Sequence, residues 1–266
     1  MIGSSLGEQW GGEKEILIVN AGTIKKNGKR VLEILKQAHE GLYTNTFPIG
    51  DSGEDFPSWL DQLKDTDGSE QFTIVLAGSG LYGAGNPEIN GICAGTYFPE
   101  SNTAYLNSIV VDCTSRTCGL GCQLKRVMEN EFTGSAIKHG SELRGWFLSC
   151  EDPAKIHGDG HLSYSPIKRL KKYLEWGGQL VKCDLVLPHW LDTRKRDRES
   201  LLIAFPNKQT GIMPDSEVII DHLRSLYKSV GVTDMSDPDL LRMEMEINYS
   251  DLEADRKYIT RQYAIL

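Results

Sequence analysis

The clearest pattern along the chain lies near its middle, where an apolar run is followed by a polar turn and then by apolar residues at helical spacing. Tyr105 to Val111 is the apolar run, and its length is typical of a buried strand. The apolar residues that follow lie at offsets 0, 4, 7, 8 and 12, which is one face of a helix, and they are Leu120, Leu124, Val127, Met128 and Phe132. The segment predicts a strand, a turn and a helix in direct succession.

The residues before this segment predict two helices and three further strands. Short apolar runs predict strands at residues 15–19, 72–77 and 91–98. Apolar positions at helical spacing predict a helix over residues 28–42 and a second one over 56–63. Residues 20–27 predict a turn-rich connection, and residues 99–102 predict a turn. The strands over residues 72–77, 91–98 and 105–111 are therefore expected to form an antiparallel meander that leads into the central turn.

The residues after this segment predict three strands and three helices. Strands are expected at residues 142–150, 179–187 and 200–205, the last two joined by a charged loop. Ser165 and Pro166 favour the start of a helix that ends at Gly177 and Gly178. An amphipathic helix follows around Leu223, and a helical stretch begins near Pro238.

Length and composition predict one domain with extensions. A chain of 266 residues with 39% apolar residues can bury one core and a small appendage. Residues 1–14 are expected to be loose, residues 15–206 to form the domain, and residues 207–266 to be a helical extension. Between Asp234 and Asp255 this extension holds eight acidic residues and one arginine.

The joint between the central strand and helix has the composition of a phosphate site. It consists of Arg116, Thr117, Cys118, Gly119, Leu120 and Gly121. Two glycines let backbone N–H groups approach a ligand at a helix N-terminus, which attracts phosphate. The segment lacks both the Gly-Lys-Ser/Thr of a P-loop and the Gly-x-Gly-x-x-Gly of a dinucleotide-binding turn. An ordinary Gly-rich turn would explain the glycines but not the arginine beside them.

This joint resembles the acyl-CoA-binding signature of the GNAT superfamily of N-acetyltransferases, Arg/Gln-x-x-Gly-x-Gly/Ala after a strand that ends in paired valines. The matching residues are Val110, Val111, Arg116, Gly119 and Gly121. The resemblance covers roughly residues 15–205 and is strongest over 91–131. It implies an α/β (α+β) fold with a mixed, mostly antiparallel central sheet, flanked by helices. The sheet would be splayed at the acyl-CoA site, where the central strand and the strand over residues 142–150 would run parallel.

The resemblance also implies an activity, the transfer of an acetyl or other acyl group from acetyl-CoA to a primary amine by direct attack in a ternary complex. Backbone N–H groups of the turn would hold the pyrophosphate, with the charge of Arg116 beside it. Backbone groups of Ile109 and Val111 would pair with the pantetheine amides. The expected donor-binding residues are Ile109, Val110, Val111, Arg116, Thr117, Cys118, Gly119, Leu120, Gly121 and Cys122. No metal is expected.

Tyr173 and Glu151 are the candidate catalytic residues. Residues 173–177 match the superfamily's Tyr-x-x-x-Gly-Phe, with Gly178 where an aromatic is usual. A phenol suits the protonation of a departing thiolate because the two pKa values are close, although Tyr173 would also suit a half-buried helix position. Glu151, at the end of its strand, is the candidate base.

Several alternatives for the base stay open. They are Asp112, His157, His161, His189 and a relay of the proton through water. Asn107 would not act as a base but would orient the amine.

Charge and hydropathy limit the partners. The formal net charge of -8 argues against nucleic acid or an anionic membrane as the main partner, and it suits an amine substrate. With no long apolar run and no leader pattern at the N-terminus, a cytoplasmic location is expected. Long connections over residues 46–57, 78–90 and 154–164 would enclose a small molecule, so a small-molecule amine is favoured. A homodimer is possible.

The cysteines and histidines do not predict a metal site. Six cysteines in a chain of this length suit reduced thiols. Cys113, Cys118 and Cys122 approach an iron–sulfur spacing, but the third interval differs from the plant-type pattern. His157 and His161 lie in a Gly-rich loop that favours a solvated segment over a rigid chelate.

Two other functions remain open. A protein or peptide N-acetyltransferase would differ only in its acceptor. A catalytically silent acyl-CoA-binding module would use the acidic C-terminal extension as an interaction surface.

Overall fold

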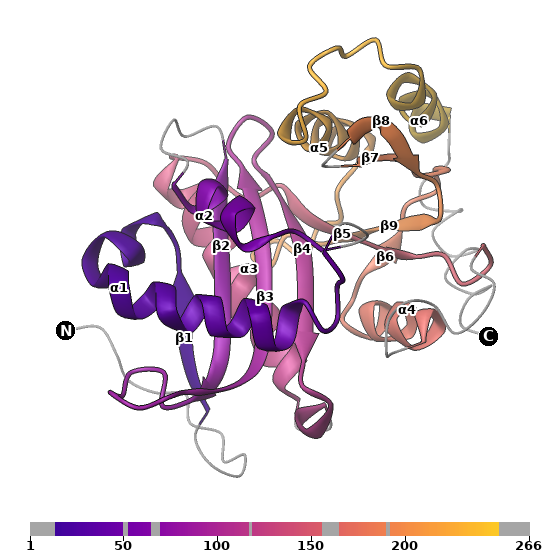
Figure 1. Cartoon of the computed structure of the whole chain (residues 1–266). Coiled ribbons are helices and arrows are strands. Elements are labelled where there is room, and N and C mark those ends of the chain that lie inside the picture. The colour runs from indigo at the N-terminus through magenta and orange to yellow at the C-terminus, as the bar shows by residue number, and fades with distance from the viewer. Residues whose placement is uncertain are drawn as a thin grey trace. The chain divides into compact units, whose positions relative to one another are not determined.

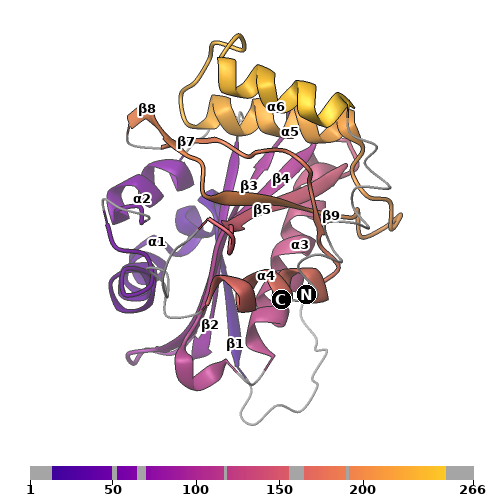
Figure 2. The same cartoon turned by 90° about the vertical axis from the view of Figure 1, so that its right-hand side faces the viewer.

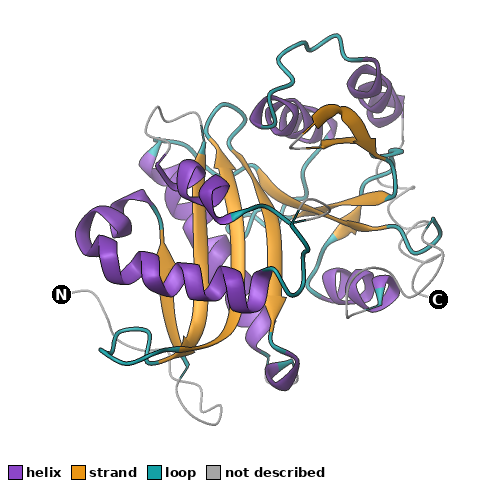
Figure 3. Cartoon of the chain, in the orientation of Figure 1, coloured by secondary structure: helices purple, strands orange, loops and turns teal. Residues whose placement is uncertain are grey.

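The structure is a computed structural model of the chain (Figures 1 and 3). It describes residues 14–49, 53–64, 70–116, 119–155, 165–189 and 192–249. The strands are β1 (Glu15–Val19), β2 (Gln71–Ser79), β3 (Glu88–Phe98), β4 (Thr103–Val111), β5 (Gly145–Glu151), β6 (Gln179–Leu180), β7 (Leu187–His189), β8 (Asp192–Asp197) and β9 (Ser200–Phe205). The helices are α1 (Ala21–Ala38), α2 (Phe56–Lys64), α3 (Leu120–Lys138), α4 (Pro166–Glu175), α5 (Ser216–Ser229) and α6 (Pro238–Tyr249), with a π-helical turn η1 (His39–Tyr43) and a 3-10 turn η2 (Cys113–Ser115). In these ranges no helix is long and apolar enough to cross a membrane.

The described strands form one sheet of seven strands and one of two. The larger sheet has the order β1-β2-β3-β4-β5-β9-β6, and the smaller pairs β7 with β8. β1 pairs antiparallel with β2, and β9 pairs antiparallel with both β5 and β6. β4 and β5 are parallel. This mixed, mostly antiparallel sheet flanked by helices confirms the predicted fold class.

The chain divides into two compact units. Unit 1 comprises Met1–Lys64, Thr73–Ala94 and Ser108–Met128. Unit 2 comprises Asp65–Phe72, Gly95–Asn107 and Glu129–Leu266. The division falls inside β2, β3, β4 and α3, so each of these elements has residues in both units.

In unit 1, α1 and α2 lie on one face of the strands and the first half of α3 lies on the other (Figures 1 and 2). The apolar stripe of α1 is buried at Val31, Ile34 and Leu35. Trp59 of α2 is 1% exposed. Its ring packs edge-on against that of Tyr43, with the ring centres 4.5 Å apart. Packing of these apolar faces positions both helices.

The first helix begins earlier than the apolar pattern predicts. The pattern predicts a connection over residues 20–27, but α1 begins at Ala21. The Asn20 side chain caps it by accepting hydrogen bonds from Thr23 N at 3.0 Å and Thr23 Oγ1 at 3.1 Å. The helix is kinked at Asn27, where φ is -130° and ψ is 28°. The buried stripe begins only after the kink, so periodicity detects the second part of the helix alone.

In unit 2 the two C-terminal helices belong to the main core. α5 and α6 lie side by side (Figure 2). They join strands β5 and β9 in one cluster of buried residues. The fully buried residues of the two helices include Ile219, Leu223, Tyr227, Leu240, Met243 and Ile247. Burial of this many apolar side chains is a major source of stability for the unit.

The prediction for residues 179–200 is wrong in two respects. The expected strand over 179–187 is reduced to the two residues of β6, since only one further backbone hydrogen bond to β9 follows, from Val181 N to Leu202 O at 2.9 Å. The expected charged loop contains β8, which pairs antiparallel with β7 through Leu187↔Asp197 and Pro188↔Arg196. The sequence of β8, DTRKRD, has no apolar residue and therefore no alternating pattern to detect.

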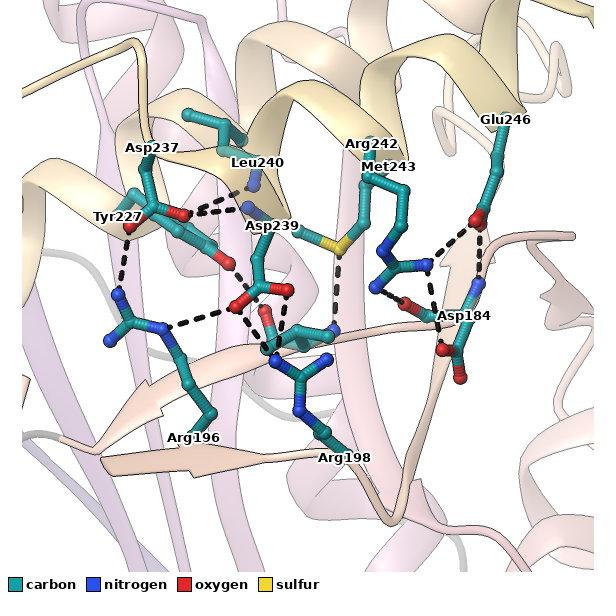
Figure 4. A network of polar contacts seen from close by, with 11 residues as sticks. Asp184, Arg196, Arg198, Tyr227, Asp237, Asp239, Leu240, Arg242, Met243 and Glu246 are labelled. Atoms are coloured by element: carbon teal, nitrogen blue, oxygen red, sulfur yellow. Dashed lines mark hydrogen bonds and ion pairs between the residues drawn. The ribbon is translucent and has the colours of Figure 1, made fainter. Parts of the chain in front are cut away.

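Ion pairs join this β7–β8 hairpin to α6 (Figure 4). Arg196 Nη2 lies 2.8 Å from Asp237 Oδ2, and Arg198 Nη2 lies 3.0 Å from Asp239 Oδ2. Asp237 Oδ1 also accepts hydrogen bonds from the backbone nitrogens of Asp239 and Leu240, at 3.0 and 3.2 Å. One carboxylate thus caps the start of α6 and binds the hairpin.

Candidate functional site

The turn that follows β4 is fixed by hydrogen bonds within unit 1. Asp112 N donates to Asn90 O of β3 at 2.9 Å. Asp112 Oδ1 accepts from Thr114 N at 2.9 Å and from Thr114 Oγ1 at 2.5 Å. These bonds from Thr114 hold the pKa of Asp112 below its usual value, because they stabilise the ionised carboxylate. Asp112, one of the candidate bases, therefore serves as the cap of η2.

Gly119 stands at the start of α3 with a backbone that favours glycine. Its φ is 73°, in the left-handed region, and its carbonyl accepts from Gln123 N at 3.1 Å in the first turn of the helix. A Cβ placed on Gly119 would have no heavy atom within 4 Å. This open space leaves room for an anion beside the first N–H groups of α3, which have no partner within the helix, so the residues present are compatible with a pyrophosphate.

A second glycine brings α3 close to β3. A Cβ on Gly91 would lie 2.7 Å from Leu124 Cδ1 and 3.3 Å from Leu120 Cδ2. Leu120 and Leu124 are 4% and 0% exposed. Close packing of these leucines over Gly91 fixes the N-terminal turn of α3 on the strand.

Arg116 folds back onto the end of β4. Its Nε donates to Val111 O at 3.2 Å, and the side chain is exposed. Val110 is buried, whereas Ile109 and Val111 are half-buried on the alternate positions of the strand. Of the predicted ligands in this segment, Ile109, Val111 and Arg116 are therefore at least partly accessible, whereas Val110 and Leu120 are buried. In the first turn of α3 Gly121 is half-buried and Cys122 is exposed.

Two of the predicted ligands, Thr117 and Cys118, lie outside the described residues.

Within unit 2 the parallel pairing of β4 and β5 ends early. β5 continues to Glu151 and remains paired with β9 as far as Glu151↔Ser200. On its other side the described pairs with β4 are Thr103↔Gly145, Ala104↔Trp146 and Tyr105↔Phe147. Side-chain exposure changes at the same place, because β4 is buried from Thr103 to Leu106 and exposed at Asn107. The two strands therefore open after Tyr105, as the predicted splay requires.

A hydrogen bond between side chains bridges the strands where the backbone pairing stops. The hydroxyls of Tyr105 and Ser149 lie 2.6 Å apart. Burial raises the pKa of Tyr105 to about 12, so the phenol stays neutral. This pair escapes sequence analysis because a Ser and a Tyr inside apolar runs leave no motif.

Glu151 is bound by an arginine of α4. Arg169 Nη2 forms an ion pair with Glu151 Oε2, and the two side chains are 12% and 24% exposed. The predicted base thus has one oxygen occupied and the other, Oε1, as its remaining acceptor. The sequence offers Arg169 only as one member of a basic run, Lys168 to Lys172, that could contact the 3'-phosphate of CoA or an acidic acceptor but is more often solvated, so its pairing with Glu151 was not predicted.

Tyr173 lies one helical turn after Arg169, so both side chains leave the same face of α4. The Tyr173 side chain is half-buried, and its ring lies 5.5 Å from that of Trp176. The departure from the superfamily motif at Gly178 has a physical reason. A Cβ there would lie 2.6 Å from Ile203 Cγ2 and 2.8 Å from Phe205 Cζ, so no larger residue fits.

The other candidates are scattered. Asn107 Oδ1 accepts from Thr96 Oγ1 at 3.1 Å. His189 ends β7 opposite Asp192. His157 and His161 lie outside the described residues. Among the described residues no group of three or more His, Cys, Asp or Glu could hold a metal ion, and Cys113 and Cys122 are free.

Comparison of the sequence with models of known protein families finds no match, and comparison with curated proteins finds none. Solved structures with a similar course of the chain include GNAT-family acetyltransferases. One, from Bacteroides thetaiotaomicron, has 16% sequence identity and a TM-score of 0.49, over 83% of this chain and 99% of that one. The ribosomal-protein-S18-alanine N-acetyltransferase from Escherichia coli has 10% identity and a TM-score of 0.41, over 73% of this chain and 94% of that one. A GNAT-family acetyltransferase from Staphylococcus aureus has 16% identity and a TM-score of 0.41, over 74% and 100%. These similarities leave the activity to be argued from the residues of this chain.

Proposed function

We propose that this protein is an acyl-CoA-dependent N-acyltransferase that moves an acetyl group from acetyl-CoA to the primary amine of a small molecule. The observation that carries the proposal is the early end of the β4–β5 pairing. A strand edge without a ladder partner offers N–H and C=O groups to an extended ligand that carries amides, and pantetheine is such a ligand.

The turn of unit 1 supports the same donor. The open space above Gly119 would accept the pyrophosphate, whose oxygens would accept hydrogen bonds from the first N–H groups of α3. Arg116, exposed beside this turn, would add positive charge. Ile109 and Val111 would offer their backbone groups to the pantetheine amides.

The proposed reaction is a direct transfer. The amine nitrogen attacks the thioester carbonyl carbon, a C–N bond forms, and the C–S bond breaks. Glu151, through Oε1, would take the proton that the nitrogen loses. The hydroxyl of Tyr173 would give a proton to the departing thiolate, which a phenol can do because its pKa is close to that of a thiol.

Calorimetric titration with acetyl-CoA tests the donor site. The wild-type protein should bind with a micromolar Kd, and Gly119→Glu should abolish detectable binding because its carboxylate would fill the phosphate space with negative charge. Gly140→Glu is the matched control. Gly140 follows the other end of α3, its φ is 71°, and a Cβ there also meets nothing within 4 Å. Equal weakening in both variants, or no binding by the wild type, would reject the site.

Release of free CoA in the presence of small amines tests the proton donor. Tyr173→Phe should lower kcat by about 10²-fold or more, the usual contribution of a general acid. Its Kd for acetyl-CoA should stay within about twofold, since the hydroxyl would act on the departing thiolate and not on the bound thioester. Tyr249→Phe, on a side chain that is 86% exposed, is the control. An unchanged kcat in Tyr173→Phe would remove this residue from the mechanism.

A further inference from the structure

One face of α4, continued by its C-cap residue Trp176, carries two buried nitrogen donors that have no acceptor among the described residues. Arg169 Nη1 and Trp176 Nε1 are buried and, within the described part of the chain, have no hydrogen-bond partner. Arg169, Tyr173 and Trp176 are spaced by four and three residues, so they share a face of the helix. Tyr173, the proposed proton donor, is on the same face, so the two nitrogens belong to residues on either side of it along the helix.

Unpaired donors of this kind are uncommon and costly. A buried N–H group that loses water without gaining an acceptor destabilises a fold, and most such groups in proteins have a partner. A guanidinium and an indole can only donate hydrogen bonds. The group that satisfies Arg169 Nη1 and Trp176 Nε1 must therefore be an acceptor, such as a carboxylate or carbonyl oxygen, and an ammonium cannot do so.

Arg169 is held in position to bind such a group. Its Nη2 is committed to Glu151 Oε2 at the end of β5, and this pair fixes the plane of the guanidinium. Nη1 is the neighbouring arm of the same planar fork, so its direction is fixed as well. Glu151, the partner of Arg169, belongs to the part of β5 that follows the last described pair with β4, Tyr105↔Phe147.

The charge of the helix favours an anion over a neutral acceptor. Besides Arg169, α4 carries three lysines and a single acid, Glu175, and the lysines are Lys168, Lys171 and Lys172. The Lys172–Glu175 pair, at 3.0 Å, uses one of these positive charges. Arg169 is itself paired with Glu151, so a surplus of two positive charges remains on the helix. That surplus would attract a carboxylate.

We propose that Arg169 Nη1 binds a carboxylate of a substrate, with Trp176 Nε1 donating to a second oxygen of the same molecule. The inference rests on the proposed function and narrows its substrate class. A carboxylate can come from two sources. The acceptor amine is then an amino acid, or the acyl group is the half-thioester of a dicarboxylic acid such as succinyl-CoA.

Two comparisons of CoA release distinguish the sources. In the first, acetyl-CoA is the donor, and α-amino acids are compared with their α-amides as acceptors. In the second, alkylamines without a carboxylate are the acceptors, and succinyl-CoA is compared with acetyl-CoA. The carboxylate-bearing substrate should have a kcat/KM at least about tenfold higher in one comparison, the scale of a charge-assisted hydrogen bond.

Arg169→Lys tests the residue while keeping a charge for Glu151. A lysine ammonium can pair with Glu151 but lacks the second arm, so the preference for the carboxylate should fall about tenfold or more. Its Kd for acetyl-CoA should stay within about twofold. Lys172→Gln, on an exposed residue of the same helix, is the matched control and should keep the preference.

The outcomes separate this inference from the proposed function. Equal use of charged and neutral substrates in both comparisons would overturn the carboxylate site while leaving the transferase intact, as if a bound water satisfied the two donors. If acetyl-CoA does not bind at all, the proposed function fails, and calorimetric titration with free amino acids and with succinate then decides. If an amino acid or succinate binds the wild type and Arg169→Lys abolishes that binding, the carboxylate site stands without the transferase. If neither ligand binds, the carboxylate site is overturned as well.

Discussion

His222 of α5 is a histidine whose surroundings oppose its charge. Its ring is 0% exposed and stacks on Phe147 with the ring centres 4.0 Å apart. Nδ1 lies 2.9 Å from Thr103 Oγ1, and Nε2 is buried without a partner in the described structure. Burial lowers the pKa of His222 from 6.5 to about 3, because the imidazolium would lose its hydration.

This burial predicts a pH dependence of stability. In the unfolded chain His222 takes a proton as the pH falls through about 6.5, whereas in the folded chain it stays neutral down to about 3. Its contribution is therefore complete above pH 6.5 and is lost as the pH falls toward 3. The free energy of unfolding should fall with a slope of up to about 1.4 kcal/mol per pH unit in that window.

Urea unfolding of His222→Gln between pH 7 and pH 4 is the measurement. A glutamine keeps a hydrogen-bonding side chain beside Thr103 but does not titrate, so the difference in slope between variant and wild type isolates His222. His139→Gln, the same substitution at an exposed histidine, serves as the control. Parallel curves for the wild type and His222→Gln would show that His222 does not set the pH dependence.

Single residues also mark how much of the site the sequence could predict. The turn at Gly119 was predictable because glycine, a preceding strand and a following stripe leave local signals. The role of Arg169 was not predictable, since it depends on the ion pair with Glu151, which lies 18 positions away in the sequence. No motif records that one arm of a guanidinium is paired and the other is not.

At the scale of elements, the β7–β8 hairpin and α6 depend on charged side chains at their contact. Arg196 and Asp237 have side chains 19% and 11% exposed. Arg196 Nε also lies 3.4 Å from Asp239 Oδ2. Mostly buried ion pairs of this kind do not add much net stability, but the loss of one partner leaves an uncompensated charge.

Arg196→Ala should therefore lower the free energy of unfolding by about 3 kcal/mol, measured by urea denaturation. Arg194→Ala is a matched control two residues earlier on β8. Arg194 is paired with Asp192 but its side chain is 89% exposed, so its removal should change stability little. The double variant Arg196→Ala/Asp237→Asn removes both charges of the pair. It should therefore recover part of the free energy of unfolding that Arg196→Ala loses. Similar effects of the two single substitutions would refute the role of burial.

The elements that sequence analysis missed share a physical cause. Residues 21–27 are helical without an apolar stripe, since their start is fixed by the Asn20 cap. β8 is a strand without an apolar alternation, since backbone pairing with β7 and ion pairs to α6 hold it. Periodicity detects elements that bury a face, such as β4 and α3, and these were predicted correctly.

At the scale of the whole molecule, the fold class was predictable but the composition of the two units was not. The division between the units falls inside β2, β3, β4 and α3. It reflects the density of contacts between distant segments, and no shift in composition or linker marks it. The parallel pairing of β4 with β5 followed only from the resemblance of one turn to a known superfamily.

The shared core of β9, α5 and α6 has a consequence for how the protein is made. The inner residues of α6, Leu240, Met243 and Ile247, complete a hydrophobic cluster to which Leu202 and Ala204 of β9 also belong. A ribosome that adds about 5 to 20 residues per second reaches the end of α6 several seconds after β9. During that interval the nascent strand presents an uncovered apolar face, so this half of the protein should fold late in translation and depend on chaperones until α6 emerges.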